Sequence, residues 1–274
     1  MVDSAKILPI AAILLPAMIV GGVLVRARAY VRGTTLAAPC VWAWVALLSV
    51  AGVELLAAIT ATEGPPRWLN AARCLAALAT FCPVMAVLGA KRPQDRAWQI
   101  IVASLWGVLS LPALQDLLYH YGQPVALDPA WRGFLTILVA VGWVNYLPTR
   151  FWPSSILFGL AQVVLMTDYL PIALPIYASA RVPAALTLAA LAGLLPILGW
   201  PGQRPAADSL DGLWRDFRNA YGMLWGVRIR DRASGGAAAP SAGASADRSA
   251  EERTFVAHLQ RFVSREWIAA RSQQ

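Results

Sequence analysis

The stretch ILPIAAILLPAMIVGGVLV, residues 7–25, decides the class of fold. It holds no charged residue from end to end, and about 20 apolar residues are enough for a helix to cross the hydrocarbon of a bilayer. Arg26, Arg28 and Arg32 follow it, whereas the positive charge of a secretory signal peptide precedes the apolar run. The sequence therefore predicts a membrane-spanning helix at residues 7–25.

The composition extends this prediction to the whole chain of 274 residues. Hydrophobic residues make up 58% and charged residues 14%, and the mean hydropathy is +0.55. Soluble domains carry about 25% charged residues, so a soluble enzyme, a coiled coil and a disordered chain are all disfavoured. The net charge is +8, but the basic residues flank apolar runs, so lipid headgroups explain this charge better than nucleic acid does.

Further apolar runs predict an all-α membrane protein, with a bundle of seven transmembrane helices within residues 1–203. Each run has about the length that a helix needs to cross the bilayer. The predicted spans are Ile7–Val25, Leu36–Thr62, Cys74–Ala90, Trp98–Tyr119, Trp131–Leu147, Trp152–Leu170 and Val182–Trp200.

The short loops carry unequal numbers of basic residues on the two sides of this bundle. Eight Lys and Arg residues follow odd-numbered spans, and five lie on the other side. Because cytoplasmic loops are enriched in Lys and Arg, we expect the N-terminus outside and the C-terminus in the cytoplasm. The preference for Arg over Lys and the richness in Ala are typical of bacteria, so the predicted location is the cell inner membrane.

After Pro201-Gly202 the pattern becomes that of an amphipathic helix within residues 204–232. Its apolar residues recur at steps of three and four, and its arginines lie mostly off this stripe. We expect the helix to lie in the inner membrane surface, and packing on the inner face of the bundle is the alternative. The residues assigned to this membrane-surface helix are Trp214, Arg215, Phe217, Arg218, Tyr221 and Trp225.

Two further segments complete the predicted organisation. Residues 233–250 are mostly Ala, Ser and Gly, which is the composition of a flexible linker. Residues 251–274 regain helical periodicity, with Phe255, Leu259 and Phe262 on one face. We expect this cytoplasmic helix to dock on a partner protein, on lipid or back on the bundle.

Three acidic residues, Glu54, Asp116 and Asp168, lie within apolar runs, where ionisable groups are costly and mark candidate functional sites. All three fall in the outer halves of spans that run from inside to outside. In the functional interpretation they bind a cation, a proton or a small solute. In the structural alternative, Asp116 and Asp168 are solvated and Glu54 is held by Arg73. The candidate binding residues at this depth are Glu54, Arg73, Gln115, Asp116, His120 and Asp168.

The sequence predicts no catalytic residue, no metal site and no cofactor. The two histidines, His120 and His258, lie on opposite sides of the predicted membrane, which excludes a multi-histidine zinc site. The cysteines lie in or beside apolar runs and are expected to be buried thiols. No H-E-x-x-H, G-x-S-x-G or P-loop signature is present.

These observations favour a non-enzymatic membrane scaffold or accessory subunit whose basic C-terminal helices recruit a partner. The first alternative is a small-solute or ion transporter or channel with an acidic site in the outer half. The second is a lipid-modifying enzyme that uses Glu54, Asp116 and His120. The expected partners are the lipid bilayer and a protein at the cytoplasmic C-terminal helix, with no nucleic acid.

Overall fold

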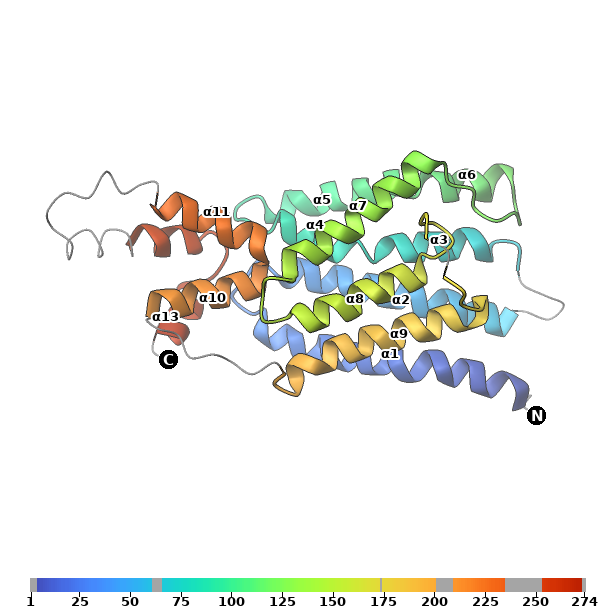
Figure 1. The fold of residues 1–274 in the computed structure, drawn as a ribbon, viewed down its shortest axis with the longest axis horizontal. Coiled ribbons are helices and arrows are strands. Elements are labelled where there is room, and N and C mark those ends of the chain that lie inside the picture. Colours follow the sequence, from blue (N-terminus) through green and yellow to red (C-terminus); the bar gives the residue numbers. More distant parts are fainter. Residues whose placement is uncertain (1–3, 61–65, 173, 201–208, 235–252, 273–274) are drawn as a thin grey trace, which may run out of the picture.

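The computed structural model describes residues 4–60, 66–172, 174–200, 209–234 and 253–272, and the regular elements in these ranges are helices, with one isolated β-bridge. Helices α1 to α9 run along a common long axis and form a bundle (Figure 1). Their bounds are α1 Ser4–Tyr30, α2 Ala37–Thr60, α3 Leu69–Ala79, α4 Cys82–Leu88, α5 Asp95–Leu109, α6 Leu111–Tyr119, α7 Pro129–Tyr146, α8 Trp152–Leu165 and α9 Ala178–Ile197.

Four segments of this bundle are long and apolar enough to cross a membrane: Leu8–Tyr30, α2, Leu69–Leu88 and α9. Helices α5 and α6 form a fifth candidate, a span bent by 46° at Ser110. The prediction of seven spans goes beyond these four or five. Helix α7 carries polar residues near both ends, and α8 has only 14 residues, so neither meets the length and apolarity of a span by itself.

The outer surface of the bundle is apolar. Leu48, Ile59 and Ile100 are each between 65% and 70% exposed. Soluble monomers rarely expose large contiguous apolar patches, so these side chains suit contact with lipid tails.

Small residues let the helices of the bundle approach closely, as they do in membrane bundles generally. At Gly159 of α8, a Cβ atom would lie 1.5 Å from the indole Nε1 of Trp143 on α7. Cys74 and Cys82 are buried and Cys40 is half-buried, and all three are free thiols.

The remaining helices form a small unit at the end of the bundle opposite the N-terminus (Figure 1). We call residues 209–234 and 253–272 the cap. It consists of α10 (Ser209–Tyr221), α11 (Met223–Ser234), a helical segment at residues 253–259 and α13 (Arg265–Ser272). Its buried residues pack into a hydrophobic core separate from those of the bundle.

Four aromatic rings form the centre of the cap. Phe217 and Tyr221 stack with ring centroids 4.6 Å apart. Phe262 meets both edge-on at 5.3 Å and meets Trp225 at 4.8 Å. Such edge-to-face and stacked pairs stabilise a core beyond their buried area.

These rings lie on the apolar stripe that was expected to face the membrane surface. Phe217 and Tyr221 are 0% exposed, because the segment around Phe262 covers this part of the stripe with protein. Off the stripe, the guanidinium of Arg218 stacks 4.5 Å from the ring of Trp214.

The predicted linker at 233–250 lies outside the described residues from position 235 onward.

Hydrogen bonds tie the cap to loops of the bundle. The Thr35 N–H donates to the carbonyl of Phe262 at 3.0 Å, and the Arg92 N–H donates to the carbonyl of Arg261 at 2.7 Å. The indole N–H of Trp225 donates to the carbonyl of Val87 at 3.1 Å. The loops after α1 and α4 are therefore joined to the cap through main-chain groups.

Gly222, between α10 and α11, lies where the cap meets α7. Its φ is +84°, and a Cβ atom there would lie 2.3 Å from Nδ2 of Asn145. We expect Gly222→Ala to destabilise the docked cap by about 1–3 kcal/mol from backbone strain alone. Gly226→Ala is the matched control, because its φ is not positive and its nearest contact would be the Arg218 side chain at 3.0 Å.

Amide hydrogen exchange of the purified protein in detergent measures this effect. The amides of α10 and α11 should exchange faster in Gly222→Ala than in Gly226→Ala. Equal exchange in the two variants would contradict the tight contact with Asn145.

Candidate functional site

Glu54 and Arg73 form an ion pair between α2 and α3. Arg73 donates from Nε to Oε1 at 2.5 Å and from Nη2 to Oε2 at 2.7 Å. The Glu54 side chain is 11% exposed and that of Arg73 is 34% exposed. A bidentate pair of this kind is stronger and more specific in geometry than a single hydrogen bond. Arg73 is thus the partner that holds Glu54.

The other two acids are also held by nearby groups. Asp116 Oδ1 lies 3.1 Å from His120 Nδ1, and its Oδ2 accepts a hydrogen bond from the Ala126 N–H at 3.1 Å. Asp168, which follows α8 and is 59% exposed, forms an ion pair with Arg181 of α9. Each acid therefore has a local partner for an ion pair or a hydrogen bond.

The structure brings some of the six candidate residues together. Glu54 and Asp168 both interact electrostatically with Arg73, Asp116 lies beside His120, and Gln115 is exposed on α6. None of the six lines the apolar cavity between the helices of the bundle. Within the ranges that the structure describes, no group of three or more His, Cys, Asp or Glu side chains could hold a metal ion.

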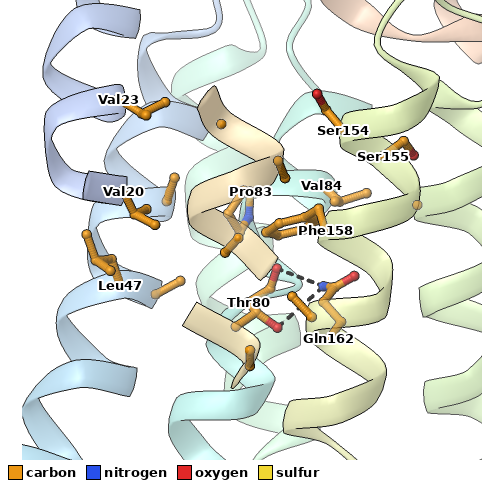
Figure 2. A pocket seen from close by; sticks show the side chains of 18 of the residues that line it. Val20, Val23, Leu47, Thr80, Pro83, Val84, Ser154, Ser155, Phe158 and Gln162 are labelled. Atoms are coloured by element: carbon orange, nitrogen blue, oxygen red, sulfur yellow. Dashed lines mark hydrogen bonds between the residues drawn. The ribbon is translucent and has the colours of Figure 1, made fainter. Parts of the chain in front are cut away.

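An apolar cavity of about 400 Å³ lies between α1, α2, α4, α7, α8 and α9 (Figure 2). Ligand pockets span roughly 300–1,000 Å³. The walls are mostly aliphatic and aromatic, with Val20, Leu47, Val84 and Phe158 among the lining residues. Sequence reasoning missed this site, because apolar residues that line a cavity follow the same pattern as those that fill a core.

A polar contact lies in the lining of the cavity. Gln162 of α8 is 4% exposed, and its amide nitrogen donates to the carbonyl of Thr80 at 3.2 Å and reaches the Thr80 hydroxyl at 3.4 Å (Figure 2). Thr80 lies at the break between α3 and α4. Pro83, in the first turn of α4, lacks the N–H that a continuous helix would donate to the carbonyl of Ala79.

This break explains why a polar side chain lies within the bundle. Irregular backbone at membrane depth is tolerated only where it is buried in protein or lines a cavity. Gln162 satisfies the exposed backbone of Thr80 from the neighbouring helix. A proline inside the third predicted span and an amide inside the sixth were the signals that could have located the cavity.

Another part of the lining carries two serines. Figure 2 shows Ser154 and Ser155 on the first turns of α8, at the opposite end of the lining from Thr80 and Gln162. Ser154 and Gln162 are eight positions apart on α8, or about 12 Å along the helix, and the lining continues beyond Gln162 to Leu165. The site is therefore elongated and mostly apolar, with polar side chains at two separate levels of α8.

Comparisons of the chain with protein-family models, curated proteins and solved structures find no match. The fold and the site define an all-helical protein, within the described ranges, with several helices able to span a membrane and an apolar cavity between them.

Proposed function

We propose that the protein is a non-enzymatic integral membrane protein, a scaffold or accessory subunit of a membrane complex, that crosses the bacterial inner membrane seven times. The observation that carries this proposal is the cap. Its hydrophobic cluster is distinct from those within the bundle, and hydrogen bonds fasten it to the bundle, so it supplies a defined surface for a partner on one side of the membrane.

The proposed seven spans include α7 and α8. Helix α7 has 18 residues and is about 27 Å long, close to the roughly 30 Å of the hydrocarbon core. Helix α8 is shorter, but the chain continues beyond it in turns to Leu170. Figure 1 shows both helices running along the bundle with the others, and α8 packs along α9. Together with α1, α2, α3–α4, α5–α6 and α9, they make up the seven segments.

The proposed orientation places the cap in the cytoplasm. Basic residues follow α1 and α4 near the cap, whereas Arg73 and Arg181 at the opposite end are paired with acids. An excess of basic residues marks the cytoplasmic side. The basic residues at the cap end of the bundle are Arg26, Arg28, Arg32, Lys91, Arg92, Arg96 and Arg150.

Photocrosslinking in cells tests the scaffold proposal. Val227 is an exposed apolar residue of α11 in the cap, and Ile100 is an exposed apolar residue of α5 in the bundle. A photoreactive amino acid at position 227 should give one discrete protein adduct that is lost when Gly222→Ala loosens the cap. The same probe at position 100 should label lipid. A probe at 227 that labels only lipid, or nothing, contradicts the scaffold proposal.

A transporter is the second candidate, and one observation favours it. Two segments of the bundle, α3–α4 and α5–α6, are interrupted at Thr80 and Ser110, and interrupted helices line the binding sites of many transporters. An acidic site in the outer half receives less support, because the acids are held by neighbouring groups. A lipid-modifying enzyme would need Glu54, Asp116 and His120 to face one cavity, whereas Glu54 is paired with Arg73.

A further inference from the structure

We infer that the cavity of the bundle binds one hydrocarbon chain of an anionic lipid, with the chain between the helices and the anionic group at Arg150, Ser154 and Ser155. This inference does not depend on the role of the cap as a scaffold. It rests on the lining, the ends and the volume of the cavity.

The walls of the cavity select an apolar occupant. Val20 and Leu47 face it from α1 and α2, and Val84 and Phe158 face it from α4 and α8 (Figure 2). An empty apolar cavity loses the dispersion contacts that a packed interior makes, and apolar cavities of this kind stay free of water. Within membrane-spanning helices, the abundant molecule that can fill such a space is a lipid chain.

The deep end of the cavity offers no free donor to an ion or a polar solute. The amide nitrogen of Gln162 is already donated to Thr80, and the Thr80 hydroxyl donates to the carbonyl of Ala77 at 2.6 Å. These two side chains satisfy the backbone at the helix break. The end of a hydrocarbon chain therefore meets no free side-chain donor of Gln162 or Thr80 here.

The part of the lining near the cap differs, because an unpaired donor precedes it directly in the chain. Arg150 directly precedes the lining residue Phe151 and stacks its guanidinium 4.7 Å from that ring. Its Nε is buried, and in the described part of the chain it has no hydrogen-bond partner. Arg150 precedes Ser154 by about one helical turn, so this unpaired cationic donor and the hydroxyls of Ser154 and Ser155 together complement an anion.

The position of this polar end agrees with a lipid headgroup. Arg150 lies in the turn between α7 and α8, and its backbone N–H donates to Asn219 of the cap at 3.1 Å. The turn is therefore at the end of the bundle, where the membrane surface is expected, while Thr80 and Gln162 lie deeper. The volume of about 400 Å³ is near the lower limit for ligand pockets and suits one chain rather than a whole phospholipid.

Photolabelling with lipids tests this inference on the full-length protein in phosphatidylcholine vesicles. The probe is phosphatidylglycerol with a diazirine on its acyl chain, and labelled peptides are identified by mass spectrometry. We expect labelling of the lining around Val84 and Phe158. Unlabelled phosphatidylglycerol should compete with the probe about tenfold better than added phosphatidylcholine does, because a charge-assisted hydrogen bond is lost with the neutral headgroup.

Two pairs of variants test the site of the hydrocarbon chain and the site of the anionic group independently. Gly142→Leu on α7 fills the cavity, since a Cβ atom there would meet Val84 only at 3.8 Å, and Gly133→Leu on the same helix is the control with open space around it. Arg150→Gln removes the charge at the polar end, and Arg96→Gln removes an exposed charge elsewhere at that end of the bundle. Labelling of the lining should fall to background in Gly142→Leu, and competition by phosphatidylglycerol should weaken about tenfold in Arg150→Gln.

A second anionic probe distinguishes the source of the ligand. A diazirine-bearing fatty acid that labels the lining in place of phosphatidylglycerol assigns the site to a free acid with the same chemistry. Equal labelling in Gly142→Leu and Gly133→Leu would overturn the cavity as the site. Equal competition by phosphatidylcholine and phosphatidylglycerol would overturn the anionic group. Arg150→Gln changes no packed core residue, so it remains informative if Gly142→Leu fails to fold.

Discussion

Replacing Phe262 with alanine is expected to release the cap from the bundle. The side chain is 2% exposed, and its ring contacts those of Phe217, Tyr221 and Trp225. Removing a buried phenylalanine costs about 3–5 kcal/mol. That is comparable with the whole stability of a small domain, roughly 5–15 kcal/mol, so a unit as small as the cap should lose its fixed packing.

Amide hydrogen exchange again measures the result. In Phe262→Ala the amides of α10, α11 and α13 should lose protection while those of α1 to α9 keep theirs. Phe134→Ala is the matched control, because Phe134 on α7 is 47% exposed. If the cap stays as protected in Phe262→Ala as in Phe134→Ala, Phe262 does not hold its core together.

Replacing Glu54 with glutamine is expected to destabilise the bundle more than Asp168→Asn does. Glutamine keeps the shape of Glu54 but leaves Arg73 as a cation without its counter-charge. Breaking a buried ion pair costs about 3–5 kcal/mol, and the partial exposure of Arg73, 34%, reduces this to roughly 2–3 kcal/mol. Asp168 is 59% exposed, and surface pairs of this kind contribute about 1 kcal/mol or less.

Thermal unfolding of the variants in one detergent compares the two losses. The double variant Glu54→Gln with Arg73→Gln should recover part of the loss, because it leaves no unpaired charge behind. Small and equal losses of thermal stability in Glu54→Gln and Asp168→Asn would show that the ion pair of Glu54 with Arg73 does not stabilise the bundle.

The parts of the fold that follow from local composition could be predicted from the sequence. Residues 7–25 lie within α1, because crossing a bilayer requires little beyond length and apolarity. The partnership of Glu54 with Arg73 could be considered in advance, because a carboxylate in an apolar run needs a nearby cation. These features depend on one segment, or on two segments at the same depth.

The cap could not be predicted in the same way. Helical periodicity identified the apolar stripe that contains Tyr221, but an apolar stripe fits a membrane surface and a protein surface equally well. What decides between them is the packing of Phe262 on Tyr221, and 41 positions separate these residues along the chain. Periodicity identifies the face of a helix and not what covers it.

The cavity was beyond prediction for a related reason. Val20, Val84 and Phe158 are ordinary core residues by type and spacing. The space between them arises from how the helices fail to close around the break at Thr80, which is a property of three-dimensional packing. The residues with a recognisable signal, Pro83 and Gln162, indicate an interrupted helix without revealing a volume.

The hydrogen bond from Thr35 to Phe262 has a consequence for biosynthesis. Thr35 leaves the ribosome early and Phe262 much later. The hydrogen bond between them therefore forms only after the intervening helices have been made. A chain whose synthesis stopped before Phe262 would keep its apolar helices but leave the stripe at Tyr221 uncovered. Unfinished copies would therefore expose aromatic side chains that the finished protein buries.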